Sequence, residues 1–299
     1  MNKIQSNGEK AFKVFSAVVL ALITLFAFMP FILILAASFT DETTLIRNGY
    51  SFLPQKLSLD AYVYMINQSS IILRAYGVSI LVTGVGTAVS VLITSMMAYP
   101  MARKDYKFHN TLAFAAFFTM LFSGGVVPSY ILWSRYFHLN NTYAALIIPT
   151  YLLSALNVLL VRNYFANNVP AALIESAQID GAGELRIFFK IMFPLSVPVI
   201  VTISVFTGLV YWNDWINALY YISKPKFFGI QNLLIRLMNN IQFLKTAEAS
   251  TMLGGRALDL PSTSIRMAMA ILGMLPVVLA FPLLQKYLIK GVVIGAVKG

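Results

Sequence analysis

Long apolar segments alternate with shorter polar ones along most of this 299-residue chain. A helix that crosses the hydrocarbon core of a membrane needs about 20 mostly apolar residues. Segments of that length predict an all-α, polytopic membrane protein with six transmembrane helices, at about 13–37, 77–99, 111–133, 143–162, 193–217 and 265–285.

The first apolar segment follows Lys3, Lys10 and Lys13 and ends near "AAS", as a secretory signal does. Its apolar run is longer than the roughly 7–15 residues of a signal core, so we expect a retained span. Six spans place both termini on one side of the membrane. The basic "ARKDYK" loop between the second and third spans favours the cytoplasm for that side.

The organisation between the spans predicts a single membrane domain, residues 1–299, because no repeat or flexible linker divides the chain. Two longer, more polar segments at about 38–76 and 218–264 are expected on the outer side. Apolar residues at helical spacing in the second predict a short helix there: Leu233, Leu234, Leu237, Ile241 and Leu244.

The stretch "IESAQIDGAGELRIFFKIMFPLSVP", Ile174 to Pro198, interrupts the apolar pattern with charges, glycines and prolines. Pro170 suits the first turn of a helix, and Ile174 and Ala177 share one face of it while Glu175 lies elsewhere. This spacing predicts a short amphipathic helix at about 170–182 on the membrane face. An ordinary interfacial connector is the alternative interpretation.

A sharp turn is expected after this short helix, because Gly181 and Gly183 follow it. A second helix then begins near Glu184 and leads back into the membrane. Its apolar residues at three- and four-residue spacing are Leu185, Phe188, Ile191 and Met192.

Composition agrees with a membrane protein and excludes several kinds of chemistry. The chain is 59% hydrophobic and 11% charged, against about 25% charged in globular domains. The net charge of +11 reflects topology rather than nucleic-acid binding, because the basic residues lie between apolar spans. With no cysteine and two histidines, the sequence offers neither a zinc site nor a nucleophile with a base, so we expect no enzyme.

The central stretch resembles the "EAA" signature of permease subunits of ATP-binding-cassette importers. The residues that carry the resemblance are Glu175, Ala177, Asp180, Gly181, Ala182, Ile191, Pro194 and Pro198. Ser176 replaces the middle residue of the usual triplet, a small-for-small change.

Other stretches are similar to carbohydrate permeases related to the maltose-system subunit, in the branch that serves complex oligosaccharides. They are "FSGGVVPSYILW", "LNNTYAALIIP", "YWNDWINALYYI" and the tail "QKYLIKGVVIGAVKG". The resemblance runs from about residue 13 to the last residue.

This resemblance implies a bacterial importer in the cell membrane, with a second permease subunit, two ATPase subunits and an extracellular or periplasmic solute-binding protein. The short helix would be the coupling helix that docks in the ATPase, through Glu175, Ser176, Ala177, Asp180, Gly181 and Ala182. ATP and magnesium would be bound by the ATPase, since this chain has no phosphate loop of the G-x-x-x-x-G-K-[ST] kind. The tail, with Lys290 and Lys298, either reaches toward the ATPases or anchors the helix end.

Aromatic and amide residues near the outer end of the fifth span are candidates for the oligosaccharide path. A carboxylate such as Asp214 close to lipid usually faces a protein interior or a water-filled cavity. An interfacial aromatic belt is the alternative for the rings, and interhelical hydrogen bonding is the alternative for the weaker candidates Tyr130 and Asn157. The remaining candidates are Trp212, Asn213, Trp215, Asn217 and Tyr220.

Six basic and two acidic residues lie between Lys224 and Arg266. This excess favours either an acidic glycan or docking of an acidic solute-binding protein. A secondary transporter or channel without an ATPase is the rival function. It is disfavoured because the apolar cores hold essentially no ionisable residue beyond Asp214.

Overall fold

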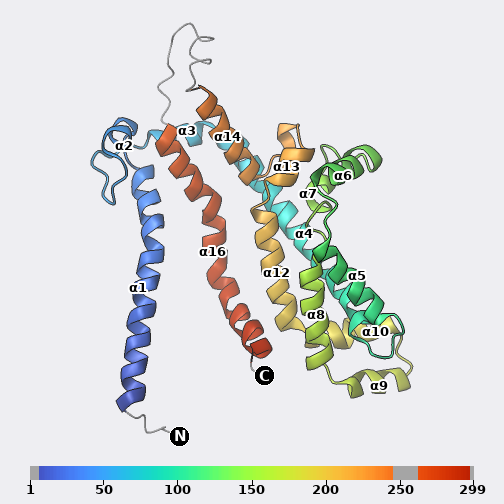
Figure 1. Cartoon of the computed structure of the whole chain (residues 1–299). Helices are drawn as coiled ribbons and strands as arrows, with labels where there is room; N and C mark the ends of the chain where they lie inside the picture. The colour runs from blue at the N-terminus through green and yellow to red at the C-terminus, as the bar shows by residue number, and fades with distance from the viewer. Residues whose placement is uncertain (1–6, 245–261, 297–299) are drawn as a thin grey trace. The chain divides into compact units, whose positions relative to one another are not determined.

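The computed structural model describes residues 7–244 and 262–296, which form helices joined by loops (Figure 1). The helices are α1 Asn7–Ser38, α2 Glu42–Asn48, α3 Asp60–Asn67, α4 Ser69–Ala102, α5 His109–Leu121, α6 Val126–Ile131, η1 Leu132–Tyr136, α7 Ala144–Ile147, α8 Ala155–Asn168, α9 Ala171–Ile179, α10 Glu184–Ile187, η2 Phe188–Met192, α11 Phe193–Leu195, α12 Val197–Trp212, α13 Ile216–Tyr221, η3 Pro225–Phe227, α14 Ile230–Leu244 and α16 Ser262–Ala296. The all-α prediction is confirmed.

Three unbroken helices in the described ranges are long and apolar enough to cross a membrane, at Gly8–Ser38, Ser69–Ala102 and Thr263–Pro282. They match the first, second and sixth predicted spans. The predicted helix between the fifth and sixth spans is present as α14. The side chain of Lys290, the residue Lys298, and the basic residues Lys245 and Arg256 of the outer segment lie outside what the structure describes.

The third and fifth predicted spans are broken helices. The third bends by 112° between α5 and the α6–η1 pair, where Gly125 has φ +83°. The fifth bends by 82° between Glu184–Leu195 and α12, which has Pro198 in its first turn. Counting each bent pair as one span gives up to five in the described residues, so the count of six is not confirmed. The predicted fourth span, 143–162, covers α7, a loop and the start of α8.

Two compact units make up the chain, one from residues 1–69 with 237–275 and the other from 70–236 with 276–299. The larger unit buries an apolar cluster where α4, α8, η2 and α12 meet, with Phe165, Ile187, Phe188, Met192 and Ile203 almost fully buried. The prediction of a single membrane domain stays a prediction.

Close packing in the larger unit depends on Gly86, on α4. A Cβ atom there would lie 2.8 Å from the ring of Tyr211, on α12. The Tyr211 hydroxyl in turn donates a hydrogen bond to the Ile147 carbonyl at 2.8 Å. Gly84, two residues earlier, would place a Cβ in open space. Of these two α4 glycines, Gly86 is therefore the one that permits close helix packing.

In the smaller unit, Glu42 caps the first turn of α16. Its carboxylate accepts hydrogen bonds from the backbone amides of Thr263 and Ser264 at 2.9–3.0 Å and from the Ser264 hydroxyl at 3.1 Å. A negative charge at this end also complements the helix dipole. Burial raises the pKa of Glu42, but these hydrogen bonds outweigh burial and hold it below its ordinary value.

We expect the Glu42 cap to make the protein more stable above pH ~4.3, the ordinary pKa of a glutamate. Because the folded-state pKa is lowered, this stabilisation is complete above the unfolded pKa and is lost as pH falls through the folded pKa. Glu42→Gln should cost about 1 kcal/mol at pH 7 and flatten the pH dependence of Tm between pH 3 and 6. Glu9→Gln, an exposed carboxylate on α1, is the control, and parallel pH profiles of wild type and Glu42→Gln would contradict the cap.

Candidate functional site

Helix α9 occupies the predicted coupling-helix position and ends in a Schellman motif. The Ala182 amide donates to the Ala177 carbonyl at 2.9 Å, and the Gly181 amide donates to the Gln178 carbonyl at 3.0 Å. Gly181 supplies the left-handed residue of the motif, with φ +75°. The motif also favours an apolar contact between its first and last residues, and Ala177 and Ala182 pack against the same apolar cluster. Small residues at 177 and 182 and glycine at 181 thus follow from the turn geometry.

One face of α9 anchors it while the rest stays in solvent. Ile174 is buried in the apolar cluster of the larger unit, whereas Glu175 and Ser176 are exposed and Ile179 is 87% exposed. The Ser176 hydroxyl donates back to the Leu173 carbonyl at 3.2 Å, and Asp180 is the residue that ends the helix. Figure 1 shows α9 lying crosswise to α8 at the end of the bundle. The helix presents a carboxylate and an isoleucine outward from a fixed base.

Gly181→Ala should destabilise the turn by about 1 kcal/mol, because a side chain is strained at φ +75° although nothing lies within 4 Å. Gly183→Ala is the matched control. It also has open space for a Cβ, but its φ is −70°. Hydrogen exchange of the α9 amides should rise in the first variant only. Equal protection in both variants would show that the turn does not depend on the left-handed residue.

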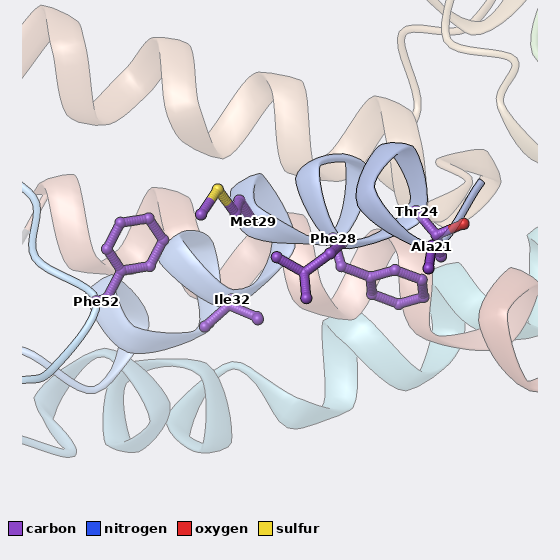
Figure 2. Close-up of a pocket in the computed structure, with 7 residues that line it drawn as sticks. Ala21, Thr24, Phe28, Met29, Ile32 and Phe52 are labelled. Atoms are coloured by element: carbon purple, nitrogen blue, oxygen red, sulfur yellow. The ribbon is translucent and has the colours of Figure 1, made fainter. Parts of the chain in front are cut away.

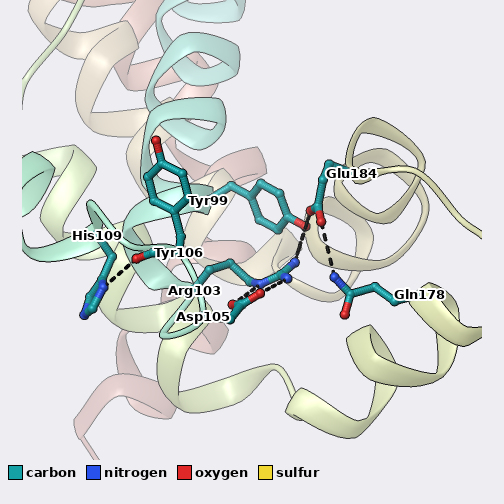
Figure 3. A network of polar contacts seen from close by, with 7 residues as sticks. All are labelled: Tyr99, Arg103, Asp105, Tyr106, His109, Gln178 and Glu184. Atoms are coloured by element: carbon teal, nitrogen blue, oxygen red, sulfur yellow. Dashed lines mark hydrogen bonds and ion pairs between the residues drawn. The ribbon is translucent and has the colours of Figure 1, made fainter.

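A polar network joins α9 to the end of α4 through Glu184, the first residue of α10 (Figure 3). Glu184 accepts hydrogen bonds from the Tyr99 hydroxyl and from Arg103 Nη1, the latter at 3.1 Å. Its other oxygen accepts from Gln178 Nε2 at 3.3 Å. Two residues that lie 81 and 85 positions before Glu184 in the sequence therefore share its carboxylate with Gln178, which lies six positions before it.

Arg103 is the cation of this network and is held from two sides. Its guanidinium donates to Asp105 as well as to Glu184, and its side chain is only 11% exposed. The hydrogen bond from Arg103 holds the pKa of Asp105 below its ordinary value, and the same bond raises the pKa of Arg103. Both groups are therefore charged at neutral pH, and the guanidinium stays aimed at Glu184.

Glu184→Ala should loosen α9 with respect to α4, because it removes the carboxylate that three side chains share. Glu184 is 59% exposed, so solvent screening limits the loss to about 1 kcal/mol, or about fivefold in the docking equilibrium of α9. Glu9→Ala is the control, since it removes an exposed carboxylate on α1 that has no contact with this network. The measurement is substrate imported per ATP hydrolysed, which should fall for Glu184→Ala alone; an equal fall in both variants would contradict the link.

These network residues were not among the sequence candidates. In the sequence, Arg103 in "ARKDYK" indicated only which side of the membrane the loop is on, and Glu184 indicated only where a helix begins. Their contact depends on the fold and could not be read from the sequence. In the second helix, Phe188 and Met192 are buried as expected. Leu185, which shares their spacing, is 65% exposed, and Ile187 is fully buried. The π-helical turn Phe188–Met192 changes the periodicity that the prediction assumed.

Two residues predicted for the substrate path, Asp214 and Asn217, form structural hydrogen bonds just after the end of α12. Asp214 Oδ1 accepts from the amides of Ile216 and Asn217 at 3.0 and 3.1 Å and so caps α13. Asn217 is buried and donates to the Pro149 carbonyl at 2.9 Å. These contacts fix α13 to the loop that follows α7. A role for either residue in the substrate path stays a prediction.

The other path candidates do not converge on one cavity. Trp212 is buried and stacks on Tyr76 at 6.2 Å, while Trp215 and Tyr220 are exposed. Asn213 is exposed and donates to the Leu209 carbonyl. Tyr130 stacks on Tyr221 at 5.8 Å. Asn157 is buried and donates to Thr207 at 3.3 Å, as the interhelical alternative predicts.

A hollow of about 680 Å³ along α1, shown in Figure 2, is unsuited to sugar. Its lining is apolar except for Thr24, whose hydroxyl already donates to the Leu20 carbonyl at 2.7 Å. A second pocket, of about 600 Å³, lies beside Trp212 and is also mainly apolar, although Thr83 Oγ1 in its wall has no hydrogen-bond partner among the described residues. Helix α9 with its network is the best-defined candidate site.

Comparison with known proteins places this geometry in a family. Residues 7–294 match the model of the family described as "Binding-protein-dependent transport system inner membrane component". The polygalacturonan/rhamnogalacturonan transport system permease protein YtcP of Bacillus subtilis is 38% identical over 94% of this chain and 96% of its own length. The arabinooligosaccharides transport system permease protein AraQ of Halalkalibacterium halodurans is 30% identical over 93% of this chain and 94% of its own.

A solved structure shares the fold. It is a chain of a bacterial ABC transporter involved in import of the acidic polysaccharide alginate, with a TM-score of 0.77 over 96% of this chain and 99% of that one, at 24% identity. The comparisons do not favour a secondary transporter or channel. This chain belongs to the inner membrane component family of binding-protein-dependent transport systems, a family of multi-pass permease subunits.

Proposed function

We propose that this permease subunit forms half of the translocation path of an ATP-driven oligosaccharide importer in a bacterial cell membrane, with both termini in the cytoplasm. Its partners are a second permease subunit, two ATPase subunits that bind ATP and magnesium, and a solute-binding protein outside. The ATPases hydrolyse ATP, and this chain performs no catalysis itself. Closure of the ATPases displaces α9, and the spans change from inward-facing to outward-facing.

The observation that carries this proposal is the exposed, anchored α9. A helix that receives force must present side chains to a partner and must be fixed to what it moves. Glu175 and Ile179 are exposed on α9, and Glu184 ties α9 to Tyr99 and Arg103 at the end of α4. Ala177 and Ala182 join the same turn to the apolar cluster.

For the substrate we propose an oligosaccharide with uronate groups. Relatives named for polygalacturonan/rhamnogalacturonan and arabinooligosaccharides support an oligosaccharide. The excess of basic residues between Lys224 and Arg266 favours the acidic kind.

Uptake into vesicles tests both parts of the proposal. The chain is reconstituted with the second permease, the ATPases and the solute-binding protein, and trigalacturonate and a neutral arabinotriose are compared. We expect uptake that requires ATP and prefers the acidic trisaccharide. Equal or better uptake of the neutral sugar would overturn the acidic substrate alone, whereas uptake without ATPase subunits would overturn the importer mechanism.

A further inference from the structure

A shallow pocket of about 710 Å³ in the larger unit carries two cations that the proposed mechanism does not use. Arg74, five residues after the start of α4, and Lys226, in η3, both line it. Neither cation forms an ion pair with any described residue. The rest of the lining is neutral: Gly77, Val78, Leu81, Thr142, Tyr143 and Phe227.

Arg74 and Lys226 form a cationic rim of this pocket, and an aromatic ring holds Lys226 in place. Lys226 Nζ lies 4.9 Å from the centre of the Phe227 ring, and Phe227 meets Tyr143 edge to face at 5.0 Å. A cation over a ring face is attracted to it, so Lys226 is held beside the pocket. Thr142 donates its hydroxyl proton to the Leu139 carbonyl. The pocket therefore offers positive charge at its rim, with no acidic residue in its lining.

The floor of the pocket continues as an exposed apolar row along a membrane-spanning helix. Gly77, Leu81, Val85 and Val89 follow one another at four-residue spacing on α4 and are all exposed. Twelve residues of helix rise about 18 Å, and one leaflet of the hydrocarbon core is about 15 Å deep. The row is long enough to carry a chain that enters at the pocket and ends near the bilayer centre.

We propose that this pocket binds an anionic phospholipid, with its phosphate between Arg74 and Lys226 and one acyl chain along the Gly77–Val89 row. The charge of the rim requires an anion, and the apolar floor requires a hydrocarbon attached to it. The carboxylate of a sugar could pair with the two cations of the rim, but a sugar has no hydrocarbon chain to cover the exposed apolar row on α4. Tyrosine, such as Tyr143 in the lining, is also typical of the headgroup level of a membrane.

Native mass spectrometry of the importer, purified with its other subunits and titrated with phosphatidylglycerol, tests this site. Arg74→Gln with Lys226→Gln should weaken binding about 30-fold, since each cation near an anionic headgroup contributes about fivefold. Arg135→Gln with Lys224→Gln is the matched control, because neither residue lines the pocket. Should the double variant fail to assemble, Lys226→Gln alone, at an exposed position in η3, should still weaken binding about fivefold.

Several outcomes would overturn the lipid site. Equal phosphatidylglycerol binding by the double variant and its control would place the lipid elsewhere. Displacement of the lipid by trigalacturonate would assign the pocket to a sugar carboxylate, and displacement by inorganic phosphate would reduce it to a simple anion site. Failure of the assembled wild-type importer to bind phosphatidylglycerol would show that no lipid site is open there, as when a protein surface covers the row. None of these results depends on transport, so the proposed function is tested separately.

Discussion

Glu175→Arg is expected to abolish productive docking of the ATPase while leaving the permease folded. Glu175 is exposed on α9, and the resemblance to importer permeases implies that it would pair with a basic group in a surface cleft of the ATPase. Reversing one partner of a charge pair that becomes buried in an interface costs at least about 2 kcal/mol, which is about 30-fold in Kd. Binding of the purified ATPase to the permease and substrate-stimulated ATP hydrolysis are the two measurements.

Glu9→Arg is the matched control for this experiment, because it makes the same charge reversal at an exposed position on α1. We expect wild-type ATPase binding in that variant. Glu175→Gln should fall between wild type and Glu175→Arg, since it removes the attraction without adding repulsion. If Glu175→Arg kept wild-type affinity and coupled hydrolysis, α9 would not be the docking helix.

Gly86→Ala is expected to lower the stability of the larger unit by about 2 kcal/mol. The new Cβ would meet three atoms of the Tyr211 ring at 2.8–3.0 Å. Overpacking of this kind typically costs 1–3 kcal/mol, and moving the ring also weakens the hydrogen bond from Tyr211 to the Ile147 carbonyl. The higher helix propensity of alanine returns about 1 kcal/mol of this at most. Thermal unfolding in detergent, followed by tryptophan fluorescence, measures the change.

Gly84→Ala tests whether space, rather than the loss of a glycine, causes that effect. Both glycines lie on α4, but a Cβ at position 84 meets nothing within 4 Å. This variant should be as stable as wild type or up to about 1 kcal/mol more stable, because alanine favours the helix. A comparable loss in both variants would contradict the close approach of α4 and α12 at Gly86.

The coupling region was largely predictable from sequence because its constraints are local. Gly181 and Gly183 predicted a sharp turn after the short helix, and the structure has φ +75° at Gly181. The helical spacing that placed Ile174 and Ala177 on one face is confirmed, because both pack in the apolar cluster. The link from Glu184 to Arg103 was not predictable, because it joins residues 81 positions apart and neither residue type is unusual at the end of a helix.

The end of α12 shows why the path residues were harder to interpret. Asp214 followed by Asn217 has the spacing of a helix cap, and the structure uses it to start α13. The same residue types also suit sugar binding, so residue identity alone does not separate the two roles. The broken spans had signals as well, since glycine at 125 and proline at 198 stand at the bends. The spans were predicted from the length of their apolar segments alone, and that criterion does not detect a break within a segment.

The bend before α12 determines the direction in which any displacement of α9 reaches the membrane. The segment Glu184–Leu195, which follows α9, meets the α12 axis at 82°. For that angle, only about one seventh of a movement along the segment projects onto the α12 axis. A push on α9 that travels along this segment therefore moves the base of α12 sideways and tilts it, rather than sliding it through the bilayer. When a helix tilts, its end moves mainly sideways and stays near the depth that it already occupies. No charged group therefore has to enter hydrocarbon.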